Sequence, residues 1–221
     1  MYNIVKIAEL NIKKSMIEAS QKYAKGSLID VGCGTKPYKN IFKNYVNSHF
    51  GIEESIQNEA HYKEKTEVDL YCNFLDLDKS YDNKYDTLLC NQVLEHVLET
   101  NKFISKCHNI LKKDGYGIFT IPMTWKLHAE PYDYYRFTKY SIEKLFKENG
   151  FIIIEIKPLE GSLATIGQLI ILYLCDLKIN NIFFKAFRRF MFYALDFIAL
   201  KIDKKFFVDN ICLTYLLVVK K

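Results

Sequence analysis

Glycine and proline are scarce in this sequence, which holds 9 Gly and 4 Pro among its 221 residues. That scarcity excludes a collagen-like repeat. Hydrophobic residues make up 49% of the chain and charged residues 26%, so apolar side chains suffice for a packed core and a disordered polymer is excluded. The length also exceeds that of a miniprotein held together by disulfides. We therefore expect one folded domain over residues 1–221.

The sequence also lacks cysteine pairs at the spacing of zinc ligands. Its cysteines are widely scattered, at Cys33, Cys72, Cys90, Cys107, Cys175 and Cys212. No C-x-x-C pair occurs and no histidine lies at zinc-ligand spacing, so we expect reduced, buried thiols and no metal site. Charges at Lys6 and Glu9 interrupt the first apolar residues, so no signal peptide is apparent and a cytoplasmic protein is expected.

A block of basic residues of the kind that nucleic-acid binders carry is absent from residues 1–177. The formal net charge is +5, but from Lys178 onward nine Lys or Arg stand against three Asp or Glu, so residues 1–177 together carry −1. The excess of positive charge therefore belongs to the last part of the sequence. We expect no nucleic-acid partner.

No apolar run is long enough to cross a bilayer. Gly161–Cys175 contains no charged residue, but it has fifteen residues where a span needs about twenty, and Gln168 lies in its middle. The next segment, Ile182–Ile202, is rich in phenylalanine, and its charged residues follow one stripe of a helix. Two roles stay open for residues 161–205: a cover for the core or a dimer interface, and peripheral contact with a membrane surface.

Hydrophobic periodicity predicts strands that alternate with helices over residues 1–157. The expected strands are Ser27–Val31, Ser48–Ile52, Glu67–Cys72, Tyr85–Cys90, Tyr116–Ile121, Phe151–Ile156 and Ile211–Val219. The expected helices are Val5–Lys25 and segments near 103–111, 142–149 and 182–202. This alternation indicates βαβ crossovers, hence an α/β fold with a doubly wound, seven-stranded, mainly parallel sheet. Residues 160–205 would form a helical, aromatic-rich insertion before the last strand, which we place at a sheet edge.

The segment after the first expected strand contains two glycines, in the run Asp30-Val31-Gly32-Cys33-Gly34. Glycine lets the backbone approach a ligand closely, because no Cβ intervenes. In doubly wound sheets ligands bind at the carboxyl ends of strands, so this turn is the expected site. Pro37 stands where a dinucleotide fold needs Gly or Ala, and Asp30 suits an ammonium group better than phosphates. The expected ligand is therefore a cationic nucleoside.

This turn and the segments that follow it resemble the class I S-adenosylmethionine-dependent methyltransferases, over about residues 28–156. The resemblance implies the Rossmann-like fold of that family and S-adenosyl-L-methionine as cofactor. It implies that Asp30, Gly32 and Gly34 cradle the methionine end of the cofactor. It also implies that Glu53, at the end of the second strand, accepts hydrogen bonds from both ribose hydroxyls, with Glu54 as the alternative.

Two further stretches resemble the same family. Asn73 stands where the family places a polar residue that reads the adenine amino group, and Asp76 is its rival. The segment Tyr85–Val97, with its Leu-Glu-His-Val ending, is similar to the family's fourth strand and the turn after it. The resemblance implies that Asn91 and Gln92 line the floor under the methyl group.

The acceptor is expected near residues 125–138, which follow the fifth strand and resemble a subgroup of bacterial methyltransferases, several encoded among surface-polysaccharide genes. His128 is the candidate general base, because histidine changes charge near neutral pH. Arg136 is the candidate group for an acceptor carboxylate or phosphate. The alternative is structural: Asp133 and Arg136 pair to staple a lid, while His128 packs against Trp125. His96 is expected to be structural, since no metal partner is spaced with it.

The resulting hypothesis is an enzyme that methylates an oxygen, in preference to a nitrogen, of a small molecule or glycan precursor. One alternative is a membrane-surface methyltransferase with a lipid-linked or quinone acceptor. Another is a non-catalytic partner subunit that binds S-adenosylmethionine. A nicotinamide dehydrogenase is disfavoured by Pro37 and by the lack of a Tyr-x-x-x-Lys pair near the fifth strand.

Overall fold

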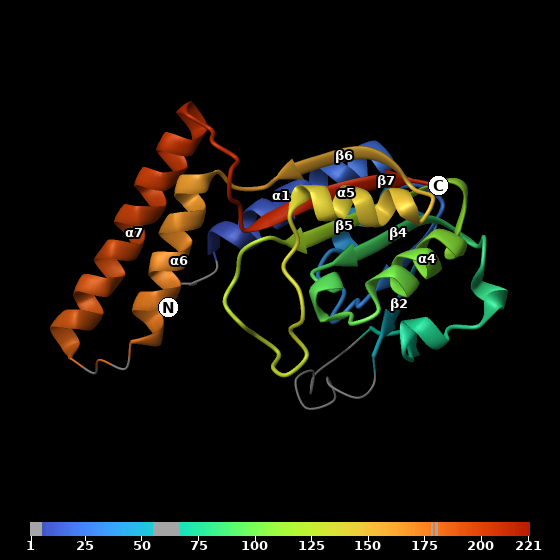
Figure 1. Ribbon diagram of the computed structural model, residues 1–221, viewed down its shortest axis with the longest axis horizontal. Helices are drawn as coiled ribbons and strands as arrows, with labels where there is room; N and C mark the ends of the chain where they lie inside the picture. Colours follow the sequence, from blue (N-terminus) through green and yellow to red (C-terminus); the bar gives the residue numbers. More distant parts are fainter. Residues whose placement is uncertain (1–5, 55–66, 178, 180) are drawn as a thin grey trace.

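A seven-stranded sheet in the order β3-β2-β1-β4-β5-β7-β6 forms the centre of the computed structural model, which describes residues 6–54, 67–177, 179 and 181–221 (Figure 1). The strands are β1 (Ser27–Val31), β2 (Ser48–Glu53), β3 (Leu70–Tyr71), β4 (Tyr85–Asn91), β5 (Leu111–Pro122), β6 (Ile152–Pro158) and β7 (Thr214–Lys220). Strands β1 to β5 pair in parallel, and β7 runs antiparallel to both β5 and β6. The predicted α/β fold with a mainly parallel, doubly wound sheet is confirmed.

Helices cover both faces of this sheet. The α-helices are α1 (Lys6–Tyr23), α2 (Lys39–Phe42), α4 (Thr100–Ile110), α5 (Lys139–Glu148), α6 (Ser162–Asp176) and α7 (Ile182–Lys205). Short 3-10 helices follow two of the strands: η1 (Phe74–Asp76) and η2 (Lys79–Tyr81) come after β3, and η3 (Leu94–His96) comes after β4. Figure 1 shows α4 and α5 in front of the sheet and α1 behind it. Val5, the first apolar position of the expected N-terminal helix, lies outside the described residues.

The core forms one layer on each face of the sheet because consecutive strand residues point to opposite sides. Leu88 packs in the layer beneath α4 and α5, whereas Leu89 packs in the layer with α1 and α2. Phe119 and Ile118 divide in the same way. All four side chains are fully buried. Because β4 and β5 are covered on both faces, these parts of their sequences are continuous apolar runs and do not alternate with polar residues.

The last strand does not lie at a sheet edge as expected. β7 lies between β5 and β6, and β6 is the edge strand. The residues of β7 from Thr214 to Val219 are all buried, whereas Ile152 and Ile154 of β6 are 60% and 41% exposed. The uncharged segment Ile211–Val219 therefore takes the position that neighbours cover on both sides, and the edge goes to the strand that carries charges. The order of strands depends on tertiary packing, which the length and polarity of one strand do not reveal.

Two other strands differ in length from the prediction. β3 is reduced to Leu70–Tyr71 within the expected Glu67–Cys72, because the Asp69 carboxylate binds the Gly51 amide at 2.7 Å and is held beside β2 by its side chain. β5 begins at Leu111, earlier than the expected Tyr116, since residues after α4 continue directly into the sheet. Neither change moves the carboxyl ends of β1 and β4.

Between β6 and β7 the chain forms the helical hairpin of α6 and α7, which stands away from the sheet at the left of Figure 1. The Asp203 carboxylate accepts a hydrogen bond from the Ala164 amide at 3.0 Å, and Arg188 Nη1 donates to the Leu174 carbonyl at 3.3 Å. These contacts hold the two helices together. Among the described residues, no helix is both long and apolar enough to cross a membrane.

Glu160, where the hairpin begins, makes stability depend on pH. Its side chain is buried, accepts hydrogen bonds from Asn11 Nδ2 and the Thr214 amide, and burial raises its pKa to about 8. The folded chain keeps the Glu160 proton up to about pH 8, whereas the unfolded chain loses it above the ordinary carboxyl pKa. The free energy of unfolding therefore falls as pH rises between these two pKa values. The Glu160→Gln variant does not titrate at this position. Its free energy of unfolding, minus that of the wild type, should therefore increase by about 2 kcal/mol between pH 6 and pH 9. Urea unfolding at both pH values measures this difference, and an unchanged difference would contradict it.

Candidate active site

The glycine turn after β1 borders a cavity of about 210 Å³ at the carboxyl ends of β1 and β4. Val31 is in register with Cys90, so the residues that follow these two strands meet at this edge of the sheet. The cavity is lined by Asp30, Gly32, Cys33, Gly34, Thr35, Pro37, Tyr38, Asn91 and Gln92. Five of the predicted cofactor residues, from two separate segments, therefore share one cavity.

The two glycines of the turn adopt left-handed backbone conformations, with φ of +68° at Gly32 and +51° at Gly34. A Cβ at Gly32 would lie 2.4 Å from Val93 Cγ2. The turn thus needs glycine at Gly32 both for its φ angle and for the close approach of Val93. This lets the backbone line the cavity directly.

Substitution of Gly32 tests this close packing. We expect Gly32→Ala to lower the free energy of unfolding by about 2 kcal/mol, because it combines an unfavourable φ with a steric clash. The added substitution Val93→Ala should recover part of the loss, since it removes the methyl group that the new Cβ meets. Thermal unfolding of the single and double variants measures both effects. A double variant no more stable than Gly32→Ala would show that the clash is not the cause.

Glu53 closes β2 with its carboxylate against the glycine turn. Glu53 Oε2 accepts a hydrogen bond from the Gly34 amide at 2.7 Å, and Oε1 accepts one from the Glu54 amide at 3.2 Å. The residue is 9% exposed. The structure thus brings Glu53 and the turn together, although Glu53 is not one of the residues that line the cavity. Its role towards ribose hydroxyls stays a prediction.

Asp30 forms a buried pair that the sequence did not indicate. Its Oδ2 lies 2.9 Å from His49 Nε2, and both side chains are less than 7% exposed. Burial raises the pKa of Asp30, while His49 and Lys36 oppose that rise. The cavity therefore has an acidic wall held in place by a histidine on the neighbouring strand.

Lys36 is a second residue that sequence reasoning missed. It adopts a φ of +50°, and its side chain is 3% exposed. Lys36 Nζ donates to Asp69 Oδ2 at 2.5 Å and to the His49 carbonyl at 3.3 Å. Lys36 thus ties the glycine turn to β2 and to the residue that precedes β3.

The predicted floor of the site is oriented by Thr120 on β5. Thr120 Oγ1 donates to Asn91 Oδ1 at 2.6 Å, and Gln92 Nε2 donates to Thr120 Oγ1 at 3.2 Å. Asn73 lies apart from this group. It is exposed, and its Oδ1 caps η1 by accepting from the Leu75 amide at 2.9 Å. Its Nδ2 donates to Glu54 Oε1 at 3.4 Å. An adenine-reading role for Asn73 stays a prediction.

The segment after β5 is held by the ion pair of Asp133 and Arg136. Arg136 Nη1 and Nη2 donate to the two Asp133 oxygens at 2.6 and 2.7 Å, and the Asp133 side chain is 1% exposed. Arg136 lowers the pKa of Asp133 well below its usual range. The staple weighed as an alternative is thus present, and it occupies both terminal nitrogens of Arg136. A contact of Arg136 with an acceptor anion stays a prediction.

His128 lies at the same staple, because its amide donates to Asp133 Oδ2 at 3.0 Å. The ring that it meets is His96, with centroids 4.7 Å apart and an edge-to-face angle of 77°. His96 Nδ1 in turn donates to the Tyr132 carbonyl at 2.8 Å. His96 therefore anchors the segment, as its expected structural role requires.

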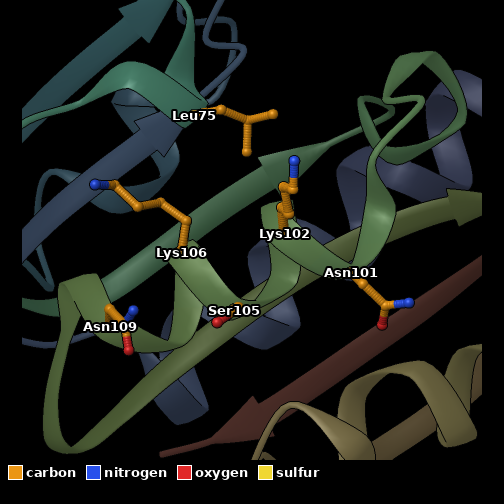
Figure 2. Close-up of a pocket in the computed structure, with 6 residues that line it drawn as sticks. All are labelled: Leu75, Asn101, Lys102, Ser105, Lys106 and Asn109. Atoms are coloured by element: carbon orange, nitrogen blue, oxygen red, sulfur yellow. The ribbon is translucent and has the colours of Figure 1, made fainter.

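A second cavity, of about 390 Å³, lies on the outer side of α4 and contains none of the predicted site residues. Figure 2 shows Lys102 and Lys106 on α4, with Leu75 on the neighbouring segment. Lys106 Nζ bonds to the Leu77 carbonyl and Lys102 Nζ to Glu99. These cations already have protein partners.

Comparison with known proteins gives a domain match and a partial relative. Residues 29–119 match a family model described as a methyltransferase domain. The chain is 28% identical over 108 residues to the ubiquinone biosynthesis O-methyltransferase of Nitrobacter winogradskyi. That match covers 46% of this chain and 41% of the relative, so the chain spans less than half the length of this protein.

Solved structures share the fold. A methyltransferase of Archaeoglobus fulgidus superposes with a TM-score of 0.61 at 16% identity, over 95% of this chain and 93% of that one. A phosphoethanolamine N-methyltransferase of Haemonchus contortus, in complex with phosphomonomethylethanolamine and S-adenosylhomocysteine, superposes with a TM-score of 0.56 at 15% identity. The latter match covers 95% of this chain and 52% of the other. Residues 29–119 thus match a methyltransferase domain, and the chain shares the fold of S-adenosylmethionine-dependent methyltransferases.

Proposed function

We propose that this protein transfers a methyl group from S-adenosylmethionine to an oxygen, in preference to a nitrogen, of a small molecule or glycan precursor in the cytoplasm. The observation that carries the proposal is the cavity where Asp30, the glycine turn and Asn91 meet. A turn without Cβ atoms beside a buried acid fits the backbone and ammonium of a methionine moiety. Glu53, bonded to the Gly34 amide, is in reach of the same turn.

When bound, S-adenosylmethionine supplies an activated methyl group for in-line displacement, so the protein mainly positions the reactants and excludes water. We assign Asp30, Gly32 and Gly34 to the methionine end, Glu53 to the ribose, Asn73 to the adenine, and Asn91 and Gln92 to the floor. His128 would take the proton of an acceptor hydroxyl. Arg136 fixes the segment that carries His128, through Asp133.

Labelled S-adenosylmethionine tests this proposal. Incubation of the protein with methyl-labelled cofactor and a cell extract should transfer label to a discrete product. His128→Asn should lower that transfer about a hundredfold, because it removes the proposed general base. His108→Asn is the matched control, since His108 lies on α4 and packs against Phe151. Failure of any product to acquire label would favour a non-catalytic subunit that binds the cofactor.

The exposed surface of α7 favours a second candidate, a methyltransferase that acts at a membrane surface on a lipid-linked or quinone acceptor. Phe183, Phe187, Phe190 and Phe197 are 82%, 56%, 67% and 60% exposed. The same helix carries basic residues, among them Lys185, Arg188 and Arg189. Exposed aromatic side chains next to basic ones are typical of helices that lie in the interface of an anionic membrane.

Vesicle flotation separates these candidates. If α7 binds membranes, the protein should float with vesicles that contain phosphatidylglycerol, and Phe187→Ser with Phe190→Ser should reduce that fraction several-fold. Tyr140→Ser is the control, because Tyr140 is 79% exposed on α5. Equal recovery in the unbound fraction for all three proteins would reject the membrane candidate. A dimer dissociated by the same two substitutions would instead assign the surface to a second copy of the chain.

A further inference from the structure

Three side chains with metal-ligating atoms meet beside η3, outside the cavity of the glycine turn. Glu95 and His96 belong to η3, and His128 comes from the segment after β5. One ligand atom from each residue lies within 4.8 Å of the others. Sequence spacing could not reveal this group, because 32 residues separate the two histidines.

The Glu95 carboxylate is the member of this group that lacks a partner. Its side chain is 0% exposed, and neither oxygen accepts a hydrogen bond in the described part of the chain. His96 Nε2 lies 3.8 Å from Glu95 Oε1, beyond hydrogen-bond distance. Burial raises the pKa of Glu95 to about 7. Buried polar groups without a partner are rare in folded proteins, and each marks a place where a proton, water or ion completes the structure.

Both imidazoles have protein partners at Nδ1. His96 Nδ1 lies 2.8 Å from the Tyr132 carbonyl, which only accepts, so Nδ1 carries the hydrogen and Nε2 keeps a lone pair. His128 Nδ1 lies 3.3 Å from both the Lys126 carbonyl and Asp133 Oδ2, with Arg136 Nη2 at 3.5 Å. Two acceptors favour a hydrogen on that nitrogen too. Histidines that ligate metals are oriented by such Nδ1 hydrogen bonds, which leave Nε2 for the ion.

We propose that Glu95, His96 and His128 form a binding site for a divalent transition-metal ion, with Zn²⁺ as the expected occupant. Two imidazoles and one carboxylate are a donor set of catalytic zinc sites and leave a coordination position open. Asp133 is neutralised by Arg136, so the charge of Glu95 is the one that a cation would compensate. The site shares His128 with the proposed methyl-transfer machinery, but its occupancy can be measured without S-adenosylmethionine.

Titration with Co²⁺, which reports its coordination by visible absorption, tests the site in the full chain. We expect one Co²⁺ per chain and its displacement by Zn²⁺. Glu95→Gln and His128→Asn should each weaken Co²⁺ binding at least tenfold, whereas Glu95→Asp should retain part of it because the carboxylate remains. His108→Asn should bind like the wild type, since His108 lies outside the group.

Absence of stoichiometric binding, or equal binding by wild type, Glu95→Gln and His128→Asn, would overturn the proposal. Should those variants fail to fold, the wild-type chain decides through carbethoxylation of its histidines mapped by mass spectrometry. Zn²⁺ should protect His96 and His128 at least tenfold and leave His108 reactive. Equal reactivity of all three with and without Zn²⁺ would exclude the site, whatever the outcome of the methyl-transfer assay.

Discussion

Replacing Glu53 with alanine should weaken the binding of S-adenosylhomocysteine by about a hundredfold. A carboxylate that accepts from two vicinal hydroxyls contributes about 1.5 kcal/mol for each hydrogen bond, and the resulting 3 kcal/mol corresponds to about two orders of magnitude in Kd. Glu53 is held in place for this role by the Gly34 amide at 2.7 Å. Isothermal titration calorimetry measures the change directly.

Glu54→Ala tests the alternative ribose ligand, because Glu54 is exposed and its Oε1 accepts from Asn73 Nδ2 at 3.4 Å, outside the glycine turn. It should bind S-adenosylhomocysteine within about threefold of the wild type, as expected for a surface side chain. Glu53→Gln keeps the shape of the side chain, so it separates lost charge from lost packing. If Glu53→Ala and the wild type bind S-adenosylhomocysteine equally well, Glu53 does not bind the ribose. If the wild type itself gives no heat, the assignment of the cavity fails.

Breaking the ion pair of Asp133 should give the largest loss of stability. The Asp133 side chain is 1% exposed and accepts from both terminal nitrogens of Arg136 and from the His128 amide. Asp133→Asn leaves a partly buried guanidinium without its counter-charge, which costs about 3 kcal/mol. Urea unfolding reports any global loss, and hydrogen exchange of residues 125–137 reports local opening of the segment.

The acid limb of the stability profile checks the same pair. Because Arg136 holds the pKa of Asp133 below its usual range, the stabilisation is present above about pH 4 and is lost as pH falls. Wild type and Asp133→Asn should therefore converge in acid. Glu143→Gln is the control, since Glu143 pairs with Lys147 on an exposed helix surface at 3.4 Å and should change stability by about 0.5 kcal/mol or less. A similar small effect of Asp133→Asn would contradict the staple.

The sequence predicted those features that depend on local pattern. Apolar runs predicted the strands before and after the glycine turn, and glycine residues predicted where a strand ends. Both signals lie within a few residues of the element that they predict. Asp30, Gly32 and Gly34 could be placed beside the cavity because they adjoin one strand, whereas Asn91 and Gln92 were placed there by the family resemblance.

What the sequence could not show are contacts between segments. His49 faces Asp30 only because β1 and β2 pair in register, and the buried Glu95 meets His128 only because the segment after β5 folds back on η3. The position of β7 inside the sheet has the same origin. Each depends on which elements become neighbours, and a single sequence carries no direct signal of that.

The interior position of β7 has a consequence for how the chain is made. A ribosome builds β5 and β6 more than fifty residues before it releases Thr214–Lys220, yet both strands form their antiparallel ladder only with that late segment. During this interval the growing polypeptide exposes two unfilled strand edges, which are templates for association with other nascent chains. The sheet is therefore completed only after Thr214–Lys220 has left the ribosome, and chaperones that shield open edges have their greatest effect before that point.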